Sequence, residues 1–544
     1  MCINKLNDNY FRQITAIYPL YVILLILIPF VAGLFINYDL FDTRELLISL
    51  IWIPFFTIPY CLFKRKFFYY LTVIICFLNG FVNLAHWILV KGPITAASLF
   101  VFFSTNYQES IDFLALKKNY NFLLLIPYLF VFILAIRFPA KIFPVKSKNY
   151  IFSLIGLISI AFVIENAFHH RLIRKGVPVL VKSTISFYKE IKAYKELNNI
   201  NTDNLKNIKA VSAEVNCKQL FVLIIGESAN RNHMSLYGYS KQTTPKLQSL
   251  NNIIVYDNVV SAYSNTLNSI LSSLTQANLE NKMDYSKSIS LIDIYRTAGF
   301  KTYWISNQSP IGIWDNLITL FAQKADVKIF ANISSNSSFE STYTASYDDK
   351  LLPLLNNYIN KKEKCKFIIL HLMGSHSSYS KRYPSNFEKF KDISTEKFRT
   401  ISEYDNSIYF NDFVVDSLIK IVKLFSQKNN AVSALIYLSD HGENVYDENN
   451  NTGHDYAQYL SKNNVEIPFL VWLSPKYKEI FYERSEIIKA NIHKPFVTDD
   501  FFHASIDLFN IKTPLLENER SIFNNAFNEK RKRILVDGKD YDKK

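Results

Sequence analysis

The chain has 544 residues, of which 49% are apolar by type, 15% are aromatic and only 20% are charged. This apolar supply is too large for a mainly disordered protein, and 13 Gly and 17 Pro exclude a collagen-like one. Five cysteines are too few for a disulfide scaffold. The net charge of +14 suits an anionic membrane surface or substrate. Nucleic acid is not expected as a partner, because no motif for it is present.

Apolar segments of membrane-spanning length recur in the first third of the chain. A bilayer core about 30 Å thick needs roughly 20 apolar residues in a helix. Five segments approach this length: Ile17–Tyr38, Leu46–Phe63, Tyr69–Leu89, Asn121–Ile136 and Ile151–Val163. A cleaved signal peptide would have a single short apolar core. We therefore expect a transmembrane domain of five helices over residues 1–168.

The basic residues of the short connections predict the orientation of this domain. The N-terminus and the second and fourth connections carry most of its Lys and Arg, whereas the first connection is acidic. Basic connections remain on the cytoplasmic side. Five spans with a cytoplasmic N-terminus predict a multi-pass membrane protein and place everything after Phe168 outside, which in a bacterium is the periplasm or the outer surface.

Two further segments suit the membrane surface. Pro93–Ser110 lies on the outer side, where Thr105 and Glu109 would share one helix face; a re-entrant loop without a ligand is the alternative. Residues 169–215 form the expected linker, and within it Pro178–Leu197 has apolar residues at helical spacing with lysines between them. Such a basic amphipathic helix suits the interface, although an ordinary linker helix is also open.

Residues 216–544 have the pattern of an α/β domain. Apolar runs alternate with helical segments, which predicts a mostly parallel sheet covered by helices. The expected strands include Leu220–Ile225, Thr302–Ile305, Phe367–Leu372, Ala434–Leu438 and Ile467–Leu473. In such sheets, ligands bind at the carboxyl ends of the strands.

Polar side chains follow three of these strands at that end. They are Glu227, His376, Asp440 and His441, and together they predict a site. Thr266 is expected at the start of a helix, because the apolar residues that follow it recur at helical spacing. A helix start favours a phosphate group, although a capping threonine without chemistry is the alternative.

The chemistry of these residues predicts a metal-assisted reaction. Two carboxylates and one imidazole, from Glu227, Asp440 and His441, are acceptable zinc ligands, and the Thr266 oxygen could take the fourth position. A metal lowers the pKa of a coordinated hydroxyl, so Thr266 would attack phosphorus and hold a covalent phosphoryl group. Imidazoles at His376 and His454 could transfer protons, although both could also be surface histidines.

Several motifs of the chain resemble those of the bacterial phosphoethanolamine transferases, in the alkaline phosphatase/sulfatase superfamily. The motifs include Gly226-Glu227-Ser228, the run from Arg231 to Tyr239, Gly374-Ser375-His376, Tyr404-Asp405-Asn406 and the run from Tyr437 to Glu443. The resemblance implies a five-helix transmembrane domain followed by an α/β/α sulfatase-like domain over residues 216–544.

The resemblance also implies the roles of individual residues. Zinc would be bound by Glu227, Asp440, His441 and the oxygen of Thr266, which would carry phosphoethanolamine. His376 and His454 would lie at the substrate and could hold a second metal. Thr105 and Glu109 would help to bind the head group of the donor. The donor would be phosphatidylethanolamine, and diacylglycerol would be the first product.

The acceptor expected from the resemblance is a lipopolysaccharide, at a core sugar or lipid A. Ala262 and Ser272 stand where the lipid A branch has cysteines, and a lysine of that branch is missing after Trp304-Ile305-Ser306-Asn307-Gln308. The chain therefore looks closer to the core branch. We expect a monomer that contacts membrane lipids. The alternatives are a phosphoglycerol transferase, a membrane-tethered sulfatase or phosphodiesterase, and a non-catalytic lipid-binding scaffold.

Overall fold

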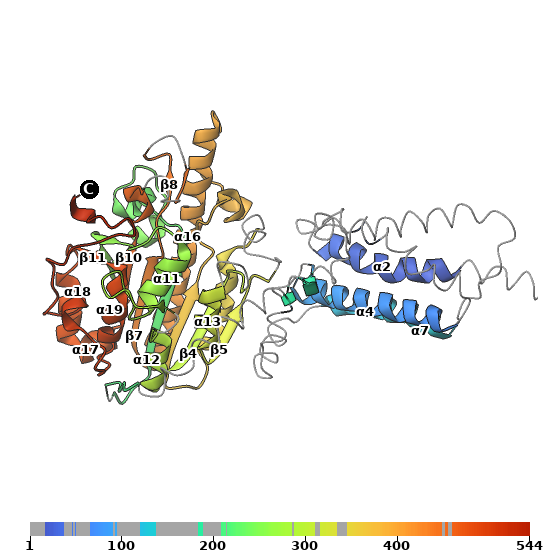
Figure 1. The fold of residues 1–544 in the computed structure, drawn as a ribbon, viewed down its shortest axis with the longest axis horizontal. Helices are drawn as coiled ribbons and strands as arrows, with labels where there is room; N and C mark the ends of the chain where they lie inside the picture. The colour runs from blue at the N-terminus through green and yellow to red at the C-terminus, as the bar shows by residue number, and fades with distance from the viewer. Residues whose placement is uncertain are drawn as a thin grey trace, which may run out of the picture. The chain divides into compact units, whose positions relative to one another are not determined.

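The structure of the chain is a computed structural model. It describes residues 17–36, 46, 49, 66–90, 93–94, 99, 120–137, 183–185, 187–188, 208–213, 215–285, 288–310, 316–333, 345–448, 452–454 and 460–543. The chain divides into two compact units, Met1–Lys189 and Glu190–Lys544 (Figure 1). Each unit has its own cluster of buried apolar side chains.

The first unit contains three apolar helices that match three of the predicted spans. They are α2 (Ile17–Ile36), α4 (Lys66–Val90) and α7 (Leu125–Arg137), the last preceded by the 3₁₀ turn η2 (Tyr120–Leu124). Within the described residues, one helical stretch, Lys66–Ile88, is long and apolar enough to cross a membrane, and the other two helices are shorter. The remaining two predicted spans lie almost entirely outside the described residues, so the number of five spans stays a prediction.

A buried tyrosine joins the three helices of this unit. The Tyr128 hydroxyl of α7 lies 3.2 Å from the carbonyl oxygen of Leu25 in α2 and 3.0 Å from that of Phe77 in α4. Gly80 makes this approach possible, because a Cβ there would lie 2.1 Å from the Tyr128 hydroxyl oxygen. The hydroxyl thus finds its partners within the protein, as a membrane interior requires.

The second unit is built on a seven-stranded sheet with the order β2-β10-β7-β1-β6-β4-β5. Five of its strands, from β7 to β5 in that order, run parallel, while β10 is antiparallel to both β7 and β2. The strands are β1 (Gln219–Gly226), β2 (Ile253–Tyr256), β4 (Lys301–Ser306), β5 (Val327–Phe330), β6 (Cys365–His371), β7 (Val432–Ser439) and β10 (Phe469–Leu473). The mostly parallel sheet predicted from the sequence is confirmed.

Helices cover both faces of this sheet. Alternate residues of the central strand β1 face opposite sides, and all eight are buried, as in the interior of a parallel sheet. On one face, Val222 belongs to the same apolar cluster as Leu355 of α15 (Leu351–Ile359) and Leu418 of α16 (Glu396–Asn429). On the other face, the Phe221 ring packs against Tyr295 of α12 (Leu291–Thr297). The α/β/α layering is therefore present.

The helices and the smaller sheets connect these strands. The helices are α10 (Pro245–Gln248), α11 (Thr266–Leu274), α12 (Leu291–Thr297), α13 (Asn316–Gln323), α15 (Leu351–Ile359), α16 (Glu396–Asn429), α17 (Pro475–Ile480), α18 (Tyr482–Ala490) and α19 (Phe501–Leu508). Two short pairs, β3 (Val259–Val260) with β11 (Phe496–Val497) and β8 (Asn444–Val445) with β9 (Thr452–Gly453), lie outside the main sheet. Of these, the β8–β9 hairpin leads directly to His454.

Candidate active site

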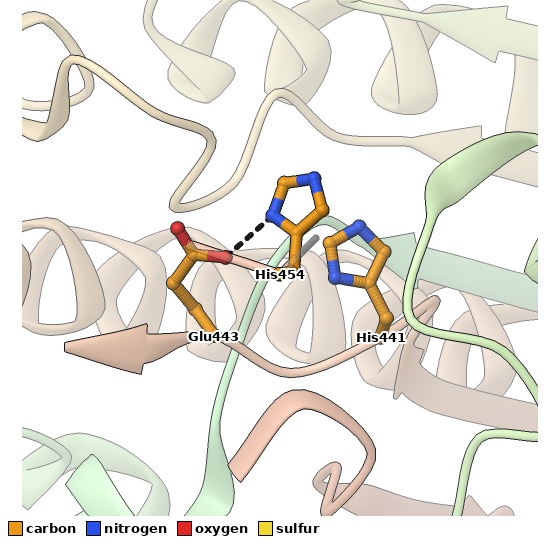
Figure 2. A group of neighbouring side chains, drawn as sticks. All are labelled: His441, Glu443 and His454. Atoms are coloured by element: carbon orange, nitrogen blue, oxygen red, sulfur yellow. Dashed lines mark hydrogen bonds and ion pairs between the residues drawn. The ribbon is translucent and has the colours of Figure 1, made fainter. Parts of the chain in front are cut away.

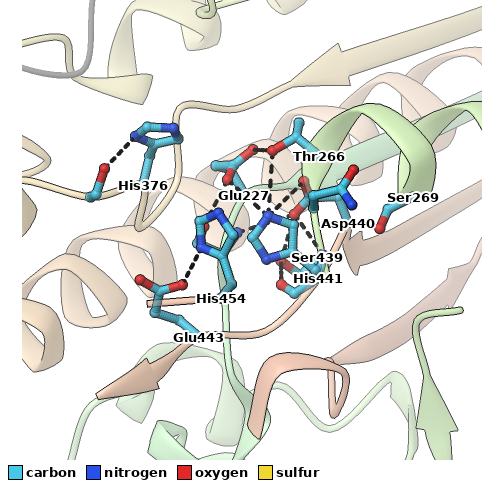
Figure 3. Close-up of polar contacts among 12 residues, drawn as sticks. Glu227, Thr266, Ser269, His376, Ser439, Asp440, His441, Glu443 and His454 are labelled. Atoms are coloured by element: carbon cyan, nitrogen blue, oxygen red, sulfur yellow. Dashed lines mark hydrogen bonds and ion pairs between the residues drawn. The ribbon is translucent and has the colours of Figure 1, made fainter. Parts of the chain in front are cut away.

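Two neighbouring strands bring the first predicted residues together. Gly226 and Ser439 are paired at the carboxyl ends of β1 and β7, so the residues that follow them, Glu227 and Asp440, emerge side by side (Figure 3). Gly374, after β6, lies against the same turn at φ +54°, and a Cβ there would be 2.6 Å from the Glu227 carbonyl oxygen. A glycine is therefore needed for the third loop to approach Glu227.

The turn after Glu227 has a strained backbone, which is stabilised by hydrogen bonds to a side chain of α16. Ser228 adopts φ +56°, a left-handed conformation that is costly for a residue other than glycine. The Tyr404 hydroxyl of α16 donates to the Ser228 carbonyl oxygen at 2.7 Å and accepts from the Asn230 amide at 2.9 Å. The Ser228 hydroxyl in turn donates to Glu227 Oε1 at 2.7 Å. These contacts fix the direction of the Glu227 carboxylate.

Thr266 enters this group from the first turn of α11. Asn265 caps the helix, because its side chain accepts from the Asn268 amide at 3.1 Å. The Thr266 hydroxyl lies 3.1 Å from Glu227 Oε2 and 3.4 Å from His441 Nε2. The hydroxyl thus stands both at the positive end of a helix and against the carboxylate and imidazole.

Glu227, Asp440 and His441 form a closed group, which we call the triad. His441 Nε2 lies 3.4 Å from Glu227 Oε1 and 3.5 Å from Asp440 Oδ2. All three side chains are fully buried. His441 Nδ1 faces the Gly442 carbonyl oxygen at 2.7 Å, so Nδ1 carries a proton and Nε2 is directed at the two carboxylates.

The electrostatics of the triad are unbalanced. Burial by itself raises the pKa of Glu227, but the hydrogen bond and charge of His441 outweigh burial and hold that pKa well below its usual value. Burial, reinforced by the negative charge of Glu227, raises the pKa of Asp440 well above its usual value. Burial lowers the pKa of His441, but the charges of Asp440 and Glu227 more than offset this and raise it to about 10. Two carboxylates thus share a single imidazole, which favours ionisation of Glu227 and opposes ionisation of Asp440.

The donor set of the triad fits a zinc ion. Asp440 Oδ2 is buried and has no hydrogen-bond partner among the described residues, which is costly for a carboxylate oxygen. One ligand atom from each of the three residues lies within 4.8 Å of the others. Two carboxylate oxygens and an imidazole nitrogen are ordinary zinc ligands. A divalent cation would satisfy the unpartnered oxygen and balance the charge.

His454 lies beside the triad and is oriented by a residue that the sequence did not single out. The His454 and His441 rings are 4.4 Å apart between centroids. Figure 2 shows Glu443 directed at His454, with 2.6 Å between Glu443 Oε2 and His454 Nδ1. The other Glu443 oxygen accepts from the Tyr379 hydroxyl at 2.6 Å. Glu443 therefore fixes the His454 ring and leaves Nε2 free to exchange a proton.

His376 follows β6 and lies to one side of the triad in Figure 3. Its Nδ1 is 3.3 Å from the Ser377 hydroxyl, and the buried Arg382 guanidinium donates to its carbonyl oxygen at 3.1 Å. Burial lowers the pKa of His376, so the ring is neutral at pH 7. His371, the last residue of β6, is buried.

Some residues at the site were missed from the sequence. Gln308 donates from Nε2 to Glu227 Oε2 at 3.0 Å and to the Leu372 carbonyl oxygen at 3.0 Å, so it orients a triad carboxylate. Gln308 and Glu443 both stand in the family motifs, directly after strand segments, and this position was the available signal. Thr105 and Glu109 lie outside the described residues, and their role stays a prediction.

Comparison with known proteins identifies the family of the chain. A protein-family model described as Sulfatase matches residues 219–511. Phosphoethanolamine transferase EptC of Escherichia coli K12 is 28% identical over 525 residues, covering 89% of this chain and 87% of the relative. Phosphoethanolamine transferase CptA of Salmonella typhimurium is 27% identical, covering 82% and 80%.

Two solved structures are also similar. The C-terminal periplasmic domain of E. coli EptC, in complex with zinc, has 30% sequence identity and a TM-score of 0.55, over 61% of this chain and 93% of that domain. The integral membrane protein EptA of Neisseria meningitidis has a TM-score of 0.50 over 94% of this chain and 98% of that one. At 18% identity, the second match shows the fold alone. The resemblance found in the motifs is confirmed, and the chain belongs to the sulfatase family and, within it, to the bacterial phosphoethanolamine transferases.

Proposed function

We propose that the chain transfers phosphoethanolamine from phosphatidylethanolamine to a lipopolysaccharide acceptor, at a core sugar or lipid A, and releases diacylglycerol. The observation that carries the proposal is the place of the Thr266 hydroxyl, 3.1 Å from Glu227 Oε2 and 3.4 Å from His441 Nε2 at the start of α11. A nucleophile at a helix start, beside a donor set for zinc, suits an attack on phosphorus.

Zinc would be held by Glu227, Asp440, His441 and the Thr266 oxygen. Its chemistry there is to lower the pKa of the threonine hydroxyl and to withdraw charge from the phosphoryl oxygens. The crystallised relative in complex with zinc supports this choice of metal. A second metal would be held by His441, Glu443 and His454, because one ligand atom from each lies within 4.8 Å of the others.

The transfer proceeds in two balanced steps. In the first, Thr266 Oγ1 loses its proton and forms a bond to phosphorus, while the bond from phosphorus to the diacylglycerol oxygen breaks and that oxygen takes up a proton. In the second, the acceptor hydroxyl gives up a proton and its oxygen bonds to phosphorus, while the bond from phosphorus to Thr266 Oγ1 breaks and that oxygen regains a proton. The positive end of α11 stabilises the phosphoryl oxygens in both steps.

Two histidines are suited to move these protons. His454 is fixed by Glu443 through Nδ1, which leaves Nε2 to give a proton to the leaving oxygen. His376 is neutral at pH 7 because burial lowers its pKa, so it can accept a proton from the acceptor hydroxyl. Having two histidines allows the acid and the base to be different groups.

We place the chain in a bacterial inner membrane, with five spans over residues 1–168, a linker over 169–215 and a periplasmic catalytic domain over 216–544. A membrane position would give the site access to phosphatidylethanolamine, and Thr105 and Glu109 would help to bind its head group. The integral membrane relative EptA supports the membrane position. The proposed enzyme works as a monomer in contact with membrane lipids.

The test is mass spectrometry of lipopolysaccharide from cells with and without the gene, together with the variants Thr266→Ala and Thr266→Ser. We expect phosphoethanolamine on the lipopolysaccharide only when a hydroxyl is present at position 266. Glycerol phosphate in its place would show a phosphoglycerol transferase. Unchanged modification by Thr266→Ala would overturn the mechanism, and no modification by the wild type would favour a hydrolase or a lipid-binding scaffold.

A further inference from the structure

A second group of two carboxylates around a buried histidine lies outside the triad. His233, in the 3₁₀ turn η4 (Arg231–His233), is 2% exposed. Its Nδ1 lies 2.8 Å from Asp405 Oδ1 of α16, and its Nε2 lies 3.0 Å from Asp447 Oδ1 in the turn after β8. We call Asp405, His233 and Asp447 the clamp.

The geometry of the clamp assigns the charge of its histidine. A neutral imidazole has a single N–H, so one of the two contacts would set a nitrogen lone pair against a carboxylate oxygen. An imidazolium donates at both nitrogens and satisfies both contacts. Burial lowers the pKa of His233, but the hydrogen bonds to Asp405 and Asp447 outweigh burial and raise it to about 9. His233 is therefore charged at pH 7.

The groups around His233 balance the negative charge of the two clamp carboxylates. Asp405 Oδ2 accepts from Lys241 Nζ at 2.7 Å and from the Tyr239 hydroxyl at 3.2 Å. The Tyr404 ring of α16 meets the imidazole edge to face, with 5.0 Å between centroids. Two carboxylates thus face two cations, His233 and Lys241.

Asp447 connects the clamp to the β8–β9 hairpin, which is flanked by Glu443 and His454. Its Oδ2 accepts from the Val445 amide of β8 at 2.9 Å. Between these two residues, Tyr446 adopts φ +63°, a conformation that persists only when its surroundings impose it. Pairing of β8 with β9 then aligns Glu443, before β8, with His454, after β9.

We propose that His233, as an imidazolium, is a positioning residue that ties α16 to the β8–β9 hairpin and so holds Glu443 and His454 in register for proton transfer. The role of His454 in that transfer rests on the proposed function. The tie itself does not, because it is a property of the fold.

Hydrogen–deuterium exchange of the full chain in detergent tests the tie without activity. The variant is His233→Gln, and the matched control is His493→Gln, since His493 meets one carboxylate, Asp257, at 2.7 Å on the surface. We expect faster exchange at residues 444–448 and 452–454 in His233→Gln and no change there in the control. Asp447→Asn should give the same local effect. This second variant keeps the contact between His233 and Asp405, so it provides the test if His233→Gln does not fold.

The rate of diacylglycerol release from phosphatidylethanolamine tests the consequence. We expect kcat of His233→Gln to fall about 10- to 100-fold, as for other residues that orient a functional group, with KM for the donor nearly unchanged. The ratio of wild-type to variant kcat should shrink as the pH rises through about 9, where His233 loses its charge. If the wild type released no diacylglycerol, the proposed function would be wrong, but the hydrogen–deuterium exchange test of the clamp would still be valid. Unchanged hydrogen–deuterium exchange at the β8–β9 hairpin in both His233→Gln and Asp447→Asn would overturn the proposal that the clamp positions this hairpin.

Discussion

The triad and the clamp have the same composition and opposite electrostatics. Each places one buried imidazole between two carboxylates, but both carboxylates of the triad are buried, whereas in the clamp Asp405 is buried and the Asp447 side chain is 25% exposed. In the clamp, both oxygens of Asp405 and both of Asp447 accept a hydrogen bond, and Lys241 adds a second cation. In the triad, one oxygen of Asp440 has no hydrogen-bond partner among the described residues.

This difference explains why similar residues serve different purposes. A buried carboxylate is tolerated when it is paired and hydrogen-bonded, and it is costly when it is not. The clamp provides its own cations and therefore stabilises the fold. The triad has only the His441 imidazole facing its two carboxylates, so it is suited to bind an additional cation. Three substitutions and one change of pH test this contrast.

The largest expected effect is on activity, from Asp440→Asn. An amide at this position is a poor zinc ligand, so bound zinc should be lost. Because a catalytic metal contributes several kcal/mol, the rate of diacylglycerol release should fall on the order of 10³-fold. Metal content by mass spectrometry and the release rate check both effects. A chelator should inactivate the wild type to a similar extent, and added zinc should restore it.

The same substitution in the clamp should act on stability instead. Asp405→Asn leaves the charges of His233 and Lys241 without their shared carboxylate, and breaking a buried pair in this way costs about 3–5 kcal/mol. Asp440→Asn in chelator replaces a carboxylate oxygen that has no hydrogen-bond partner among the described residues and faces only His441 Nε2, at 3.5 Å, so stability should stay equal or rise. Thermal unfolding of both variants in chelator measures the contrast. Equal destabilisation by both would contradict it.

The clamp should also lose its stabilising effect at alkaline pH. The pKa of His233 is raised to about 9 in the folded chain, against about 6.5 in an unfolded one. Its contribution is therefore complete below pH 6.5 and disappears as the pH rises to about 9, with a size of about 3 kcal/mol. The melting temperatures of the wild type and His233→Gln should converge by pH 10. A difference that stays constant would exclude a charged His233.

The smallest effect is expected from Gln308→Ala. The side-chain amide donates to Glu227 Oε2, and the loss of a group that orients a metal ligand weakens metal binding about 10-fold or more. Competition with a zinc-binding dye measures this affinity. Asn307→Ala serves as the control, because its side chain bonds to Asp348 and not to the triad. Equal loss in both variants would assign the effect to the fold.

Much of this arrangement could be predicted from the sequence. Local patterns placed Glu227, Asp440 and His441 after buried strands and Thr266 at the start of a helix, and the structure brings these four together. Apolar spacing marks only the inner part of helix α16 (Glu396–Asn429), because the outer turns of this helix are largely exposed and lack that spacing. The short strands β2 and β5 were missed, since four residues carry little periodicity.

The clamp could not be predicted, because its members are far apart in the chain. His233 lies 172 residues from Asp405 and 214 from Asp447, and no spacing rule joins such positions. His233 was given no role from the sequence, although it stands within the run from Arg231 to Tyr239. The charge of an imidazole depends on what faces both of its nitrogens, and only the folded chain shows this.

The most direct measurement is the mass of the peptide that contains Thr266, after the full chain has been incubated with phosphatidylethanolamine and no acceptor. We expect a gain of one phosphoethanolamine group on Thr266, which disappears when lipopolysaccharide is added and never forms in Asp440→Asn. A peptide that stays unmodified while diacylglycerol is released at the normal rate would contradict a covalent intermediate at this threonine.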